Sequence, residues 1–455
     1  MRYISYCFTT LLVLLLLTSC SSNSGPVYNL TITATPDEAG TVSPESGEYD
    51  KGQSVEIMAE SAEHWRFVRW AGDIEGDENP KTITMDSDFS ITAIFDDSPF
   101  EGGEGSKEYP YEISTIEQLQ GIGEARYLDS YFIQINDIDA SETENWNDGE
   151  GFEPIGNYPI EDNYTPFTGS YNGQNFKISR LNINRKQSRD VALFGKARGG
   201  TIKNLELDNI SIKGNIWVAG LIGINAAEIY NIQISGEIIG SDWTGGLIGW
   251  NMDGSVEHAQ VKGTVIAENF NVGGLVGQNN VPIINSSFIG SVKAKGNLGG
   301  LVGYNLLGEI VNSFSEGEVN GSEGVGGLVG VNRNIVNNTY SHSYVNGNTK
   351  VGGLIGANEE NASITKSFST GKVKASTEFG GLIGVNNENT VNNYWDDESS
   401  SLANGVGVGN SDGVTDLTTS EMQGTSAKGN MPEFDWEEIW MTVSGDYPIL
   451  RWQDE

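Results

Sequence analysis

The chain has 455 residues with 26 Lys and Arg against 62 Asp and Glu, which gives a formal net charge of −36 at pH 7. Such a charge repels nucleic acid and anionic lipid headgroups, so we set aside a nucleic-acid-binding role. Glycine is too frequent for a helical protein, at 59 residues, while a hydrophobic fraction of 37% is enough for a core.

Residues 1–19 have the pattern of a secretory signal peptide. Arg2 lies near the start, an apolar stretch runs from Leu11 to Leu17, and small residues come directly before Cys20. The stretch is shorter than the ~20 residues that a transmembrane helix needs. The sequence Leu17-Thr18-Ser19-Cys20 resembles the bacterial lipobox, which implies cleavage before Cys20 and acylation of its thiol and amine.

We therefore expect an exported protein that is anchored to a membrane through lipid on Cys20, because several acyl chains together give durable anchoring. Residues 20–27 are expected to form a flexible tether. Ser21 is not an acidic inner-membrane retention signal, which favours the outer membrane and the cell surface, with the leaflet and the orientation left open. An ordinary signal peptide whose cleavage leaves a cysteine is the alternative.

Residues 28–97 alternate apolar and polar side chains between Gly, Pro and Asp clusters, which predicts a small domain of short strands. Three segments, at 40–44, 65–72 and 83–85, resemble the divergent internalin-type B-repeat of bacterial surface proteins. The resemblance implies a compact, β-grasp-like spacer. Trp65 and Trp70 are interpreted as core residues, with a ligand platform as the alternative. Residues 98–108 are rich in Gly and acid and are predicted to be a linker with a hinge.

The second half of the chain is built from a repeat. A five-residue segment of the form Gly-Gly-Leu-Ile/Val-Gly recurs at intervals of 26 to 28 residues, and after one variable residue each copy is followed by Asn. The seven copies begin at Ala219, Gly245, Gly273, Gly299, Gly326, Gly352 and Gly380, and the seven asparagines are Asn225, Asn251, Asn279, Asn305, Asn332, Asn358 and Asn386. A degenerate eighth copy at 191–195 is predicted to be the first coil of the array.

A second motif lies between the copies, with an Asn followed five residues later by Gly, as in Asn231 and Gly236. Each period is predicted to hold two or three short strands. A unit of this length has no core of its own, so it must stack on its neighbours and form long parallel sheets. The predicted fold class is therefore all-β, with a parallel β-solenoid after the small β domain.

Two details of the repeat stay open at this point. The recurrent Asn either occupies a left-handed bend or forms hydrogen bonds with its equivalents in the coils above and below. The adjacent Leu and Ile or Val of the motif should point to opposite faces of a strand, so either the strand bends here or both faces are covered.

These repeats resemble the GLUG motif of bacterial surface and adhesin-like proteins, and the resemblance extends over about 109–452. In that family the fold is taken to be a right-handed β-helix, and a surface role is implied without a particular ligand or reaction. Residues 109–190 are expected to lead into the solenoid and to cap its N-terminal end, with a helix at 116–125. Residues 191–395 form the repeat solenoid. Residues 396–455, with Trp436, Trp440 and Trp452, form a C-terminal cap over the last coil.

The residues offer little material for catalysis or for a metal centre. The three histidines, His64, His258 and His342, lack metal-ligand spacing, and no Gly-x-Ser-x-Gly motif occurs. We therefore expect no cofactor, no metal and no catalytic residue. Calcium at acidic loops is a weaker interpretation than solvated loop charge. The loop acids concerned are Asp137, Asp139, Asp396, Asp397, Asp412 and Asp416.

The most testable candidate site is aromatic. Trp217 and Trp243 each stand two residues before the recurrent Gly pair or its Ala-Gly equivalent, and Phe270 falls one residue earlier in the next repeat. Stacked coils would present these rings as a row for a glycan or for an extracellular protein. Packing under a turn is the alternative. Trp250 and Tyr304 occupy another tolerant position that is predicted to be exposed.

The sequence thus predicts a non-enzymatic, envelope-anchored surface protein for adhesion or for carbohydrate or protein binding. Two alternatives remain. One is a carbohydrate-active β-helix enzyme, either a polysaccharide lyase or a glycoside hydrolase, and the other is a structural component of the envelope.

Overall fold

The structure is a computed structural model that describes residues 25–160 and 163–454. The chain divides after Ser98 into two compact units, each of which is described by itself. The predicted signal peptide, Cys20 and the tether as far as Ser24 lie outside the described residues. Within the described ranges, no helix has the length and apolar character needed to cross a membrane.

The N-terminal unit consists of two small β-sheets. The first has the order β3 (Gly47–Asp50), β1 (Val27–Thr35), β7 (Phe89–Asp96), β5 (Arg66–Gly72), and the second has the order β2 (Gly40–Ser43), β4 (Ser54–Ser61), β6 (Lys81–Thr84). The central strands β1 and β7 are parallel, whereas all other pairs are antiparallel. Trp70 is fully buried and donates its indole N–H to the carbonyl of Glu78 at 2.9 Å, and Trp65 packs against the same core. Both tryptophans are therefore core residues.

The second unit begins with the segment that the sequence predicts to be a linker. Phe100 is buried there, with its ring 4.6 Å from that of Tyr111 and 5.3 Å from that of Phe132. The helix α1 (Ile116–Gly121) follows and is shorter than predicted. A capping box of Thr115 and Gln118 closes its N-terminus, and its apolar side belongs to the solenoid core. Residues 99–108 are thus folded onto the second unit.

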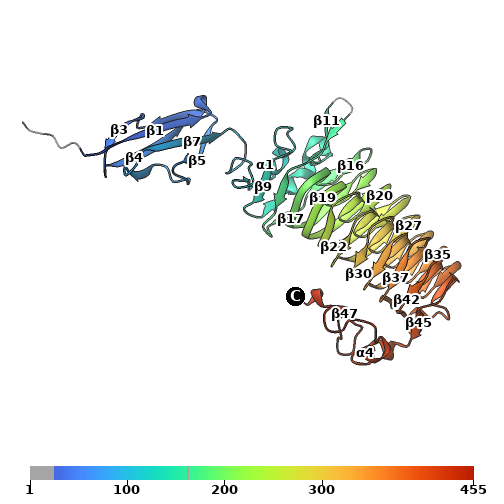
Figure 1. The fold of residues 1–455 in the computed structure, drawn as a ribbon. Coiled ribbons are helices and arrows are strands. Elements are labelled where there is room, and N and C mark those ends of the chain that lie inside the picture. Colours follow the sequence, from blue (N-terminus) through green and yellow to red (C-terminus); the bar gives the residue numbers. More distant parts are fainter. Residues whose placement is uncertain (1–24, 161–162, 455) are drawn as a thin grey trace, which may run out of the picture. The chain divides into compact units, whose positions relative to one another are not determined.

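The remainder of this unit is a parallel β-solenoid made of stacked coils (Figure 1). Strands of the first coils are β8 (Tyr111–Ile113), β9 (Tyr131–Gln134), β10 (Ile138–Asp139), β13 (Ser170–Asn172), β14 (Lys177–Ser179), β15 (Asn182–Asn184) and the hairpin β11 (Tyr158–Ile160) and β12 (Asn163–Thr165). Three long strands follow, β17 (Phe194–Lys213), β19 (Ile222–Gly240) and β22 (Ser255–Ala267), with the short β21 (Ile248–Asn251) between the last two.

Later coils have four or five short strands each, more than the two or three that the sequence predicts. Along the main 28-stranded sheet they are β24 (Val276–Asn279), β25 (Ile283–Ile284), β26 (Ser287–Lys293), β28 (Val302–Asn305), β29 (Ile310–Val311), β30 (Phe314–Asn320), β32 (Val329–Asn332), β33 (Ile335–Asn337), β34 (Tyr340–Asn346), β36 (Ile355–Asn358), β37 (Ser363–Thr365), β38 (Phe368–Ser369), β39 (Val373–Lys374), β41 (Ile383–Asn386), β42 (Thr390–Val391), β43 (Asn393–Asp396), β44 (Val406–Gly409) and β45 (Val414–Leu417).

A second sheet of eight strands takes one strand from each coil. In order these are β16 (Arg189–Val191), β18 (Ile216–Val218), β20 (Asp242–Gly245), β23 (Phe270–Gly273), β27 (Gly296–Gly299), β31 (Glu323–Gly326), β35 (Thr349–Gly352) and β40 (Thr377–Gly380). All its strand pairs are parallel, and equivalent residues of successive repeats face one another. The prediction of a parallel β-solenoid after a small β domain is confirmed.

The Gly-Leu part of each motif lies at the bend between the two sheets. The second sheet's strand β18 ends at Val218 and the main sheet's β19 begins at Ile222, so the chain turns between them. Leu221 and Ile222 are both fully buried, which the bend makes possible. The coils approach closely here, because a Cβ added to Gly246 would collide with the carbonyl oxygen of Gly274 in the next coil. The bend therefore answers the question of the two adjacent apolar residues.

The recurrent asparagines form a buried ladder through the solenoid. Each of the seven side chains is fully buried. From Asn225 onward, each amide Nδ2 donates to the Oδ1 of the next coil's asparagine at 2.9 to 3.0 Å, as far as Asn386. Asn386 itself donates to the carbonyl of Asn410 at 2.6 Å. These asparagines thus bind their equivalents above and below.

The left-handed bend belongs to the other Asn motif. Its residues have φ angles of 48° to 58°, and the series is Asn204, Asn231, His258, Asn285, Asn312, Asn338, Lys366 and Asn392. Asparagine tolerates this backbone region better than most residues. Each of the two alternatives for asparagine therefore applies to a different position of the repeat.

The predicted cap at 396–455 has two parts. After α2 (Asp397–Ser400), β44 and β45 pair with β41 and β43 and so cover the last coil, as the sequence predicts. The C-terminal tail, residues 418–454, instead lies along the side of the last coils, with the elements α3 (Thr419–Met422), α4 (Ser426–Asn430), β46 (Trp440–Met441) and β47 (Ile449–Leu450). Trp440 is fully buried, and Trp436 and Trp452 pack against the same cluster. The indole N–H of Trp452 donates to the carbonyl of Asn312 at 2.8 Å, which ties the end of the tail to an earlier coil.

The tail covers an aromatic ladder on the outer face of the main sheet. Phe314, Tyr340, Phe368 and Tyr394 are register partners in four successive coils. The rings of Phe314 and Tyr340 stack at 4.8 Å, and those of Tyr340 and Phe368 stack at 5.2 Å. In the preceding coil the ladder position is Ser287. The apolar surface therefore begins where the tail reaches the sheet.

We predict that Asn305→Leu lowers the free energy of unfolding by about 2–3 kcal/mol, because the buried amides of Asn279 and Asn332 each lose a partner. The exposed Asn387 supplies the control, and Asn387→Ala should change stability by less than about 0.5 kcal/mol. Chemical denaturation followed by circular dichroism measures both. Equal stability of the two variants would refute a structural role for the ladder.

His342 gives the tail contact a dependence on pH. Its ring lies 5.3 Å from that of Tyr447 in the tail, and burial lowers the pKa of His342 to about 4, against an opposing effect of Asp446. The unfolded chain takes up this proton near pH 6.5, whereas the native chain does so only near pH 4. The contribution of neutral His342 to the free energy of unfolding is therefore fully present above about pH 6.5 and is lost as the pH decreases toward 4.

We predict that the free energy of unfolding decreases between pH 7 and pH 4. His342 should contribute up to about 3 kcal/mol of this decrease. His342→Gln removes this contribution and should flatten the pH dependence by that amount. Denaturation curves of both proteins across this range give the difference. Parallel pH profiles for the two proteins would contradict the prediction.

Candidate functional site

The structure brings Trp217 and Trp243 together on adjacent strands, β18 and β20 of the second sheet. Their neighbours are register partners, Ile216 with Asp242 and Val218 with Thr244. Both tryptophans have left-handed backbone angles, with φ of 56° and 48°. Their ring centroids are 5.9 Å apart, and both side chains are partly exposed. Neighbouring coils thus present two indole rings side by side, as the sequence indicates.

Phe270 lies outside this row. It is the register partner of Gly296, whereas the residue that follows Trp243 in the next coil is Asn271. The side chain of Phe270 is 47% exposed, and its backbone N–H donates to Asp242 Oδ1 at 3.3 Å. The aromatic row therefore ends at Trp243, and Phe270 stands beside it.

Trp250, on the neighbouring strand β21, is the third ring of the group. Its centroid lies 6.1 Å from that of Trp217, with nearly parallel rings. The guanidinium of Arg189 lies over the ring of Trp217 at 4.2 Å, in a cation–π contact. We call Trp217, Trp243 and Trp250 the tryptophan corner.

Amide side chains continue the row beyond the tryptophan corner. Gln278 Oε1 accepts a hydrogen bond from the indole N–H of Trp243 at 2.9 Å. Asn297 donates to Asn271 Oδ1 at 2.8 Å, so that these two residues extend the row into the next two coils. Aromatic faces beside amide groups are the combination that contacts both the C–H face and the hydroxyls of a sugar.

Two indole N–H groups of the tryptophan corner have no acceptor among the described residues. They are Nε1 of Trp217 and Nε1 of Trp250, and both atoms are buried. A buried donor without a partner costs about 1–3 kcal/mol.

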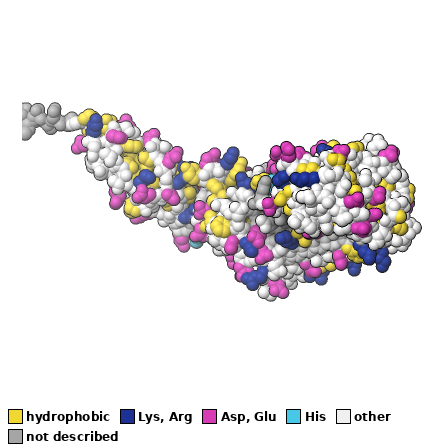
Figure 2. Space-filling view, turned by 90° about the horizontal axis from the view of Figure 1, so that it is seen from below, with side chains coloured by type: hydrophobic (Ala, Val, Ile, Leu, Met, Phe, Trp, Pro, Cys, Tyr) yellow, Lys and Arg dark blue, Asp and Glu magenta, His cyan; other side chains and the backbone are white. Residues whose placement is uncertain are grey.

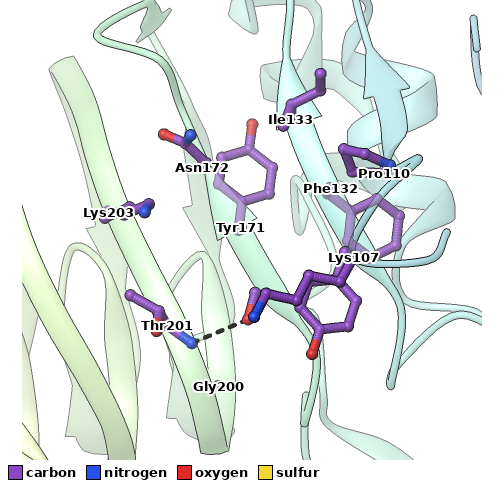
Figure 3. A pocket seen from close by; sticks show the side chains of 11 residues that line it. Lys107, Pro110, Phe132, Ile133, Tyr171, Asn172, Gly200, Thr201 and Lys203 are labelled. Carbon is purple, nitrogen blue, oxygen red and sulfur yellow. Dashed lines mark hydrogen bonds between the residues drawn. The ribbon is translucent and has the colours of Figure 1, made fainter. Parts of the chain in front are cut away.

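A separate pocket lies on the outer face of the first coils, across β9, β13 and β17. Its volume is about 550 Å³. Figure 3 shows the side chains that line it, among them Lys107, Asn172, Thr201 and Lys203. The backbone N–H of Thr201 donates to the hydroxyl of Ser170 at 3.2 Å. No motif of the sequence indicates this pocket, because it joins three segments that lie far apart in the chain.

Two of the acidic candidates, Asp396 and Asp139, have structural partners. Asp396 is fully buried and accepts hydrogen bonds from Ser399 N at 2.9 Å and Thr419 Oγ1 at 2.7 Å, as well as from the hydroxyl of Tyr447. It thus holds the tail onto the last coil. Asp139 forms an ion pair with Arg180. In the part of the chain that the structure describes, no group of three His, Cys, Asp or Glu could hold a metal ion.

Comparison with known proteins agrees with the two-part organisation. Residues 30–99 match the divergent InlB B-repeat domain, and residues 295–320 and 347–374 match the GLUG motif. The chain carries a divergent InlB B-repeat domain followed by GLUG motifs. In this GLUG solenoid, the matched segments cover β27 to β30 and β35 to β39.

Two relatives share part of the chain. Halomucin of Haloquadratum walsbyi is 32% identical over 237 residues, which is 45% of this chain and 2% of the relative. A putative Gly-rich membrane protein of Evansella cellulosilytica is 35% identical over 156 residues, 32% of this chain and 17% of the relative. The chain thus matches only a small part of the length of either one.

Two solved structures were also compared. A putative immunoglobulin A1 protease of Bacteroides ovatus has a TM-score of 0.44 and 18% identity, covering 78% of this chain and 95% of its own. A structure named IgA1 Protease has a TM-score of 0.39 and 15% identity. The match covers 74% of this chain and 28% of the other. At these scores, neither carries an argument about the activity of this chain.

Proposed function

We propose that the protein is a lipid-anchored surface protein of the bacterial envelope, which binds carbohydrate through the outer side of its solenoid without catalysis. The anchor is the lipid on Cys20, in the outer membrane, and the N-terminal domain is a spacer between the anchor and the solenoid. The lipobox-like sequence before Cys20 supports the anchor. One relative is named as a membrane protein, which is consistent with an envelope location.

The observation that carries the binding proposal is the tryptophan corner with its amide continuation. Trp217 and Trp243 lie 5.9 Å apart in adjacent coils, a spacing close to the ~4.8 Å between neighbouring strands. A saccharide lying along the solenoid axis would place its ring faces on the indoles and its hydroxyls against Asn271, Gln278 and Asn297. Such a site needs no mobile loop, because the register of the coils fixes every group in it.

The outward-facing position of Trp217 and Trp243 in the second sheet carries different residues in different coils. The positions of Trp217 and Trp243 become Asn271, Asn297, Gly324, Lys350 and Glu378 in the later coils. The neighbouring inward positions stay apolar, as with Val272 and Val325. The outer position can therefore carry different side chains in different coils without disturbing the core beneath it.

We predict that Trp217→Ala and Trp243→Ala each weaken glycan binding by about tenfold, since each removes one stacking surface. Binding of the purified protein to a glycan array, followed by calorimetry with the best glycan, provides the measurement. Trp217→Phe and Trp243→Phe keep an aromatic face and should retain part of the affinity.

Tyr230 is the matched control, because it is a 45% exposed aromatic residue on β19, away from the tryptophan corner. Tyr230→Ala should leave glycan affinity unchanged, and the melting temperatures should show that all variants are folded. Unchanged binding in both tryptophan-to-alanine variants, or no glycan bound by the native protein, would refute the proposal.

A further inference from the structure

The pocket across β9, β13 and β17 has an unusual charge for this protein. The residues that line it include two lysines and no Asp or Glu, although the whole chain carries a net charge of −36. Lys203 comes from β17, and Lys107 comes from the segment ahead of β8 (Figure 3). A local positive site on an acidic protein selects against cations and offers anions one of few favourable positions.

Both ammonium groups are free to contact a ligand. Among the described residues, neither Lys107 nor Lys203 forms an ion pair, whereas Lys177 pairs with Glu206 at 3.0 Å. Two acids adjoin the lining residues along the strand register, Glu112 as the partner of Ile133 and Glu228 as the partner of Thr201. Ser255 donates its hydroxyl to the carboxylate of Glu228. Neither pocket lysine has a carboxylate within ion-pair distance among the described residues, so both ammonium groups can contact an anion.

The neutral side chains of the pocket are arranged as further donors. Ser170 Oγ accepts from Thr201 N, so its own O–H remains to donate. Asn172 Oδ1 accepts from Gln174 N and Asn204 Nδ2, both at 3.1 Å, which leaves the NH₂ group of Asn172 for another acceptor. Two ammonium groups, a hydroxyl and an amide NH₂ together suit a ligand whose oxygens are mainly acceptors.

The remaining wall is aromatic. Tyr131 on β9 is 36% exposed and lies in register with Ser170. A phenol ring beside hydrogen-bond donors suits a sugar ring that carries a charged substituent. The volume of about 550 Å³ lies within the range of ~300–1,000 Å³ that is usual for small-ligand sites.

We propose that this pocket binds an acidic sugar unit of a polysaccharide, with its carboxylate or sulfate at Lys107 and Lys203 and its ring against Tyr131. The site is separate from the tryptophan corner and does not depend on the function proposed for it. Uronate glycans and sulfated glycans both carry such a negatively charged group. The experiment below distinguishes between these two classes of glycan.

The test is calorimetry of the purified protein at low salt with four ligands. These are a uronate oligosaccharide, a sulfated oligosaccharide, a neutral oligosaccharide of equal length and sodium sulfate. We expect one or both acidic oligosaccharides to bind and the neutral one and free sulfate to bind at least about tenfold more weakly. The acidic glycan that binds identifies the source of the anion. Affinity should fall as salt is added, because the contact is between charges.

The double variant Lys107→Gln/Lys203→Gln should lose at least about tenfold in affinity for the acidic oligosaccharide. Tyr131→Ala should weaken it by a smaller factor. Lys374→Gln is the control, because Lys374 is an exposed lysine on β39, at the other end of the solenoid. All variants should melt at the native temperature.

Three results would overturn the proposal. They are no binding of either acidic oligosaccharide, equal affinity in the double lysine variant and the native protein, and free sulfate binding as tightly as the acidic oligosaccharides. Trp217→Ala/Trp243→Ala should leave this binding intact, so failure of one site is distinguishable from failure of the other.

Discussion

The register between successive coils is the constraint on which the rest of this structure depends. The buried asparagine ladder fixes it, because each amide donates to its equivalent in the next coil. A shift of one residue would turn the amides out of the core and put apolar side chains into water. Leaving such amides buried without partners is costly, so the ladder specifies one alignment as well as stabilising it. Close glycine contacts such as that of Gly246 with Gly274 add a steric requirement to the same alignment.

A fixed interior leaves the outer positions free to differ from coil to coil. The two candidate binding regions, and the aromatic ladder under the tail, all lie at such positions. Trp217 and Trp243 stand where later coils have Asn271 and Asn297, and Lys203 stands where the next coil has Tyr230. Each region is therefore local to a few coils, although the scaffold beneath them is uniform. Several ligands or several contacts along one glycan are compatible with this arrangement.

Figure 2 shows acidic and basic side chains interspersed over the visible face. Some of the basic side chains form ion pairs with neighbouring acids, such as Arg333 with Glu359 and Lys350 with Glu323 at 2.8 Å. Exposed pairs of this kind contribute little to stability. The β9–β13–β17 pocket differs from such places because two lysines and no Asp or Glu line it.

The period, the parallel sheets and the pairing of Trp217 with Trp243 follow from the sequence, because identical motifs at constant spacing must become equivalent layers. Phe270 was harder to place. It stands three residues before its Gly pair, one more than the two tryptophans, and the strand pairing shows that Asn271 takes the position of Trp243.

The tail was placed at the wrong part of the solenoid for a similar reason. Phe288 comes three residues after its left-handed Asn285 and points into the core, whereas Phe314 comes two residues after Asn312 and points outward. In a strand, that difference of one residue decides which face carries the ring. The aromatic residues two positions after the asparagine are the signal in the sequence that could have located the tail. The pocket had no such signal, since Lys107, Ser170 and Lys203 meet only in the folded chain.

The most direct test of the stacked register is a pair of spin-label distances in a protein whose Cys7 and Cys20 are replaced by serine. Lys213 is connected to Lys374 by the register partners Ile239, Ile266, Lys293, Asn320 and Asn346. With ~4.8 Å per coil, labels at Lys213 and Lys374 should be about 29 Å apart, and labels at Lys213 and Asn346 about 24 Å apart. Narrow distributions that differ by about one coil would support the account. Broad distributions, or a Lys213–Asn346 distance that is not shorter, would contradict it.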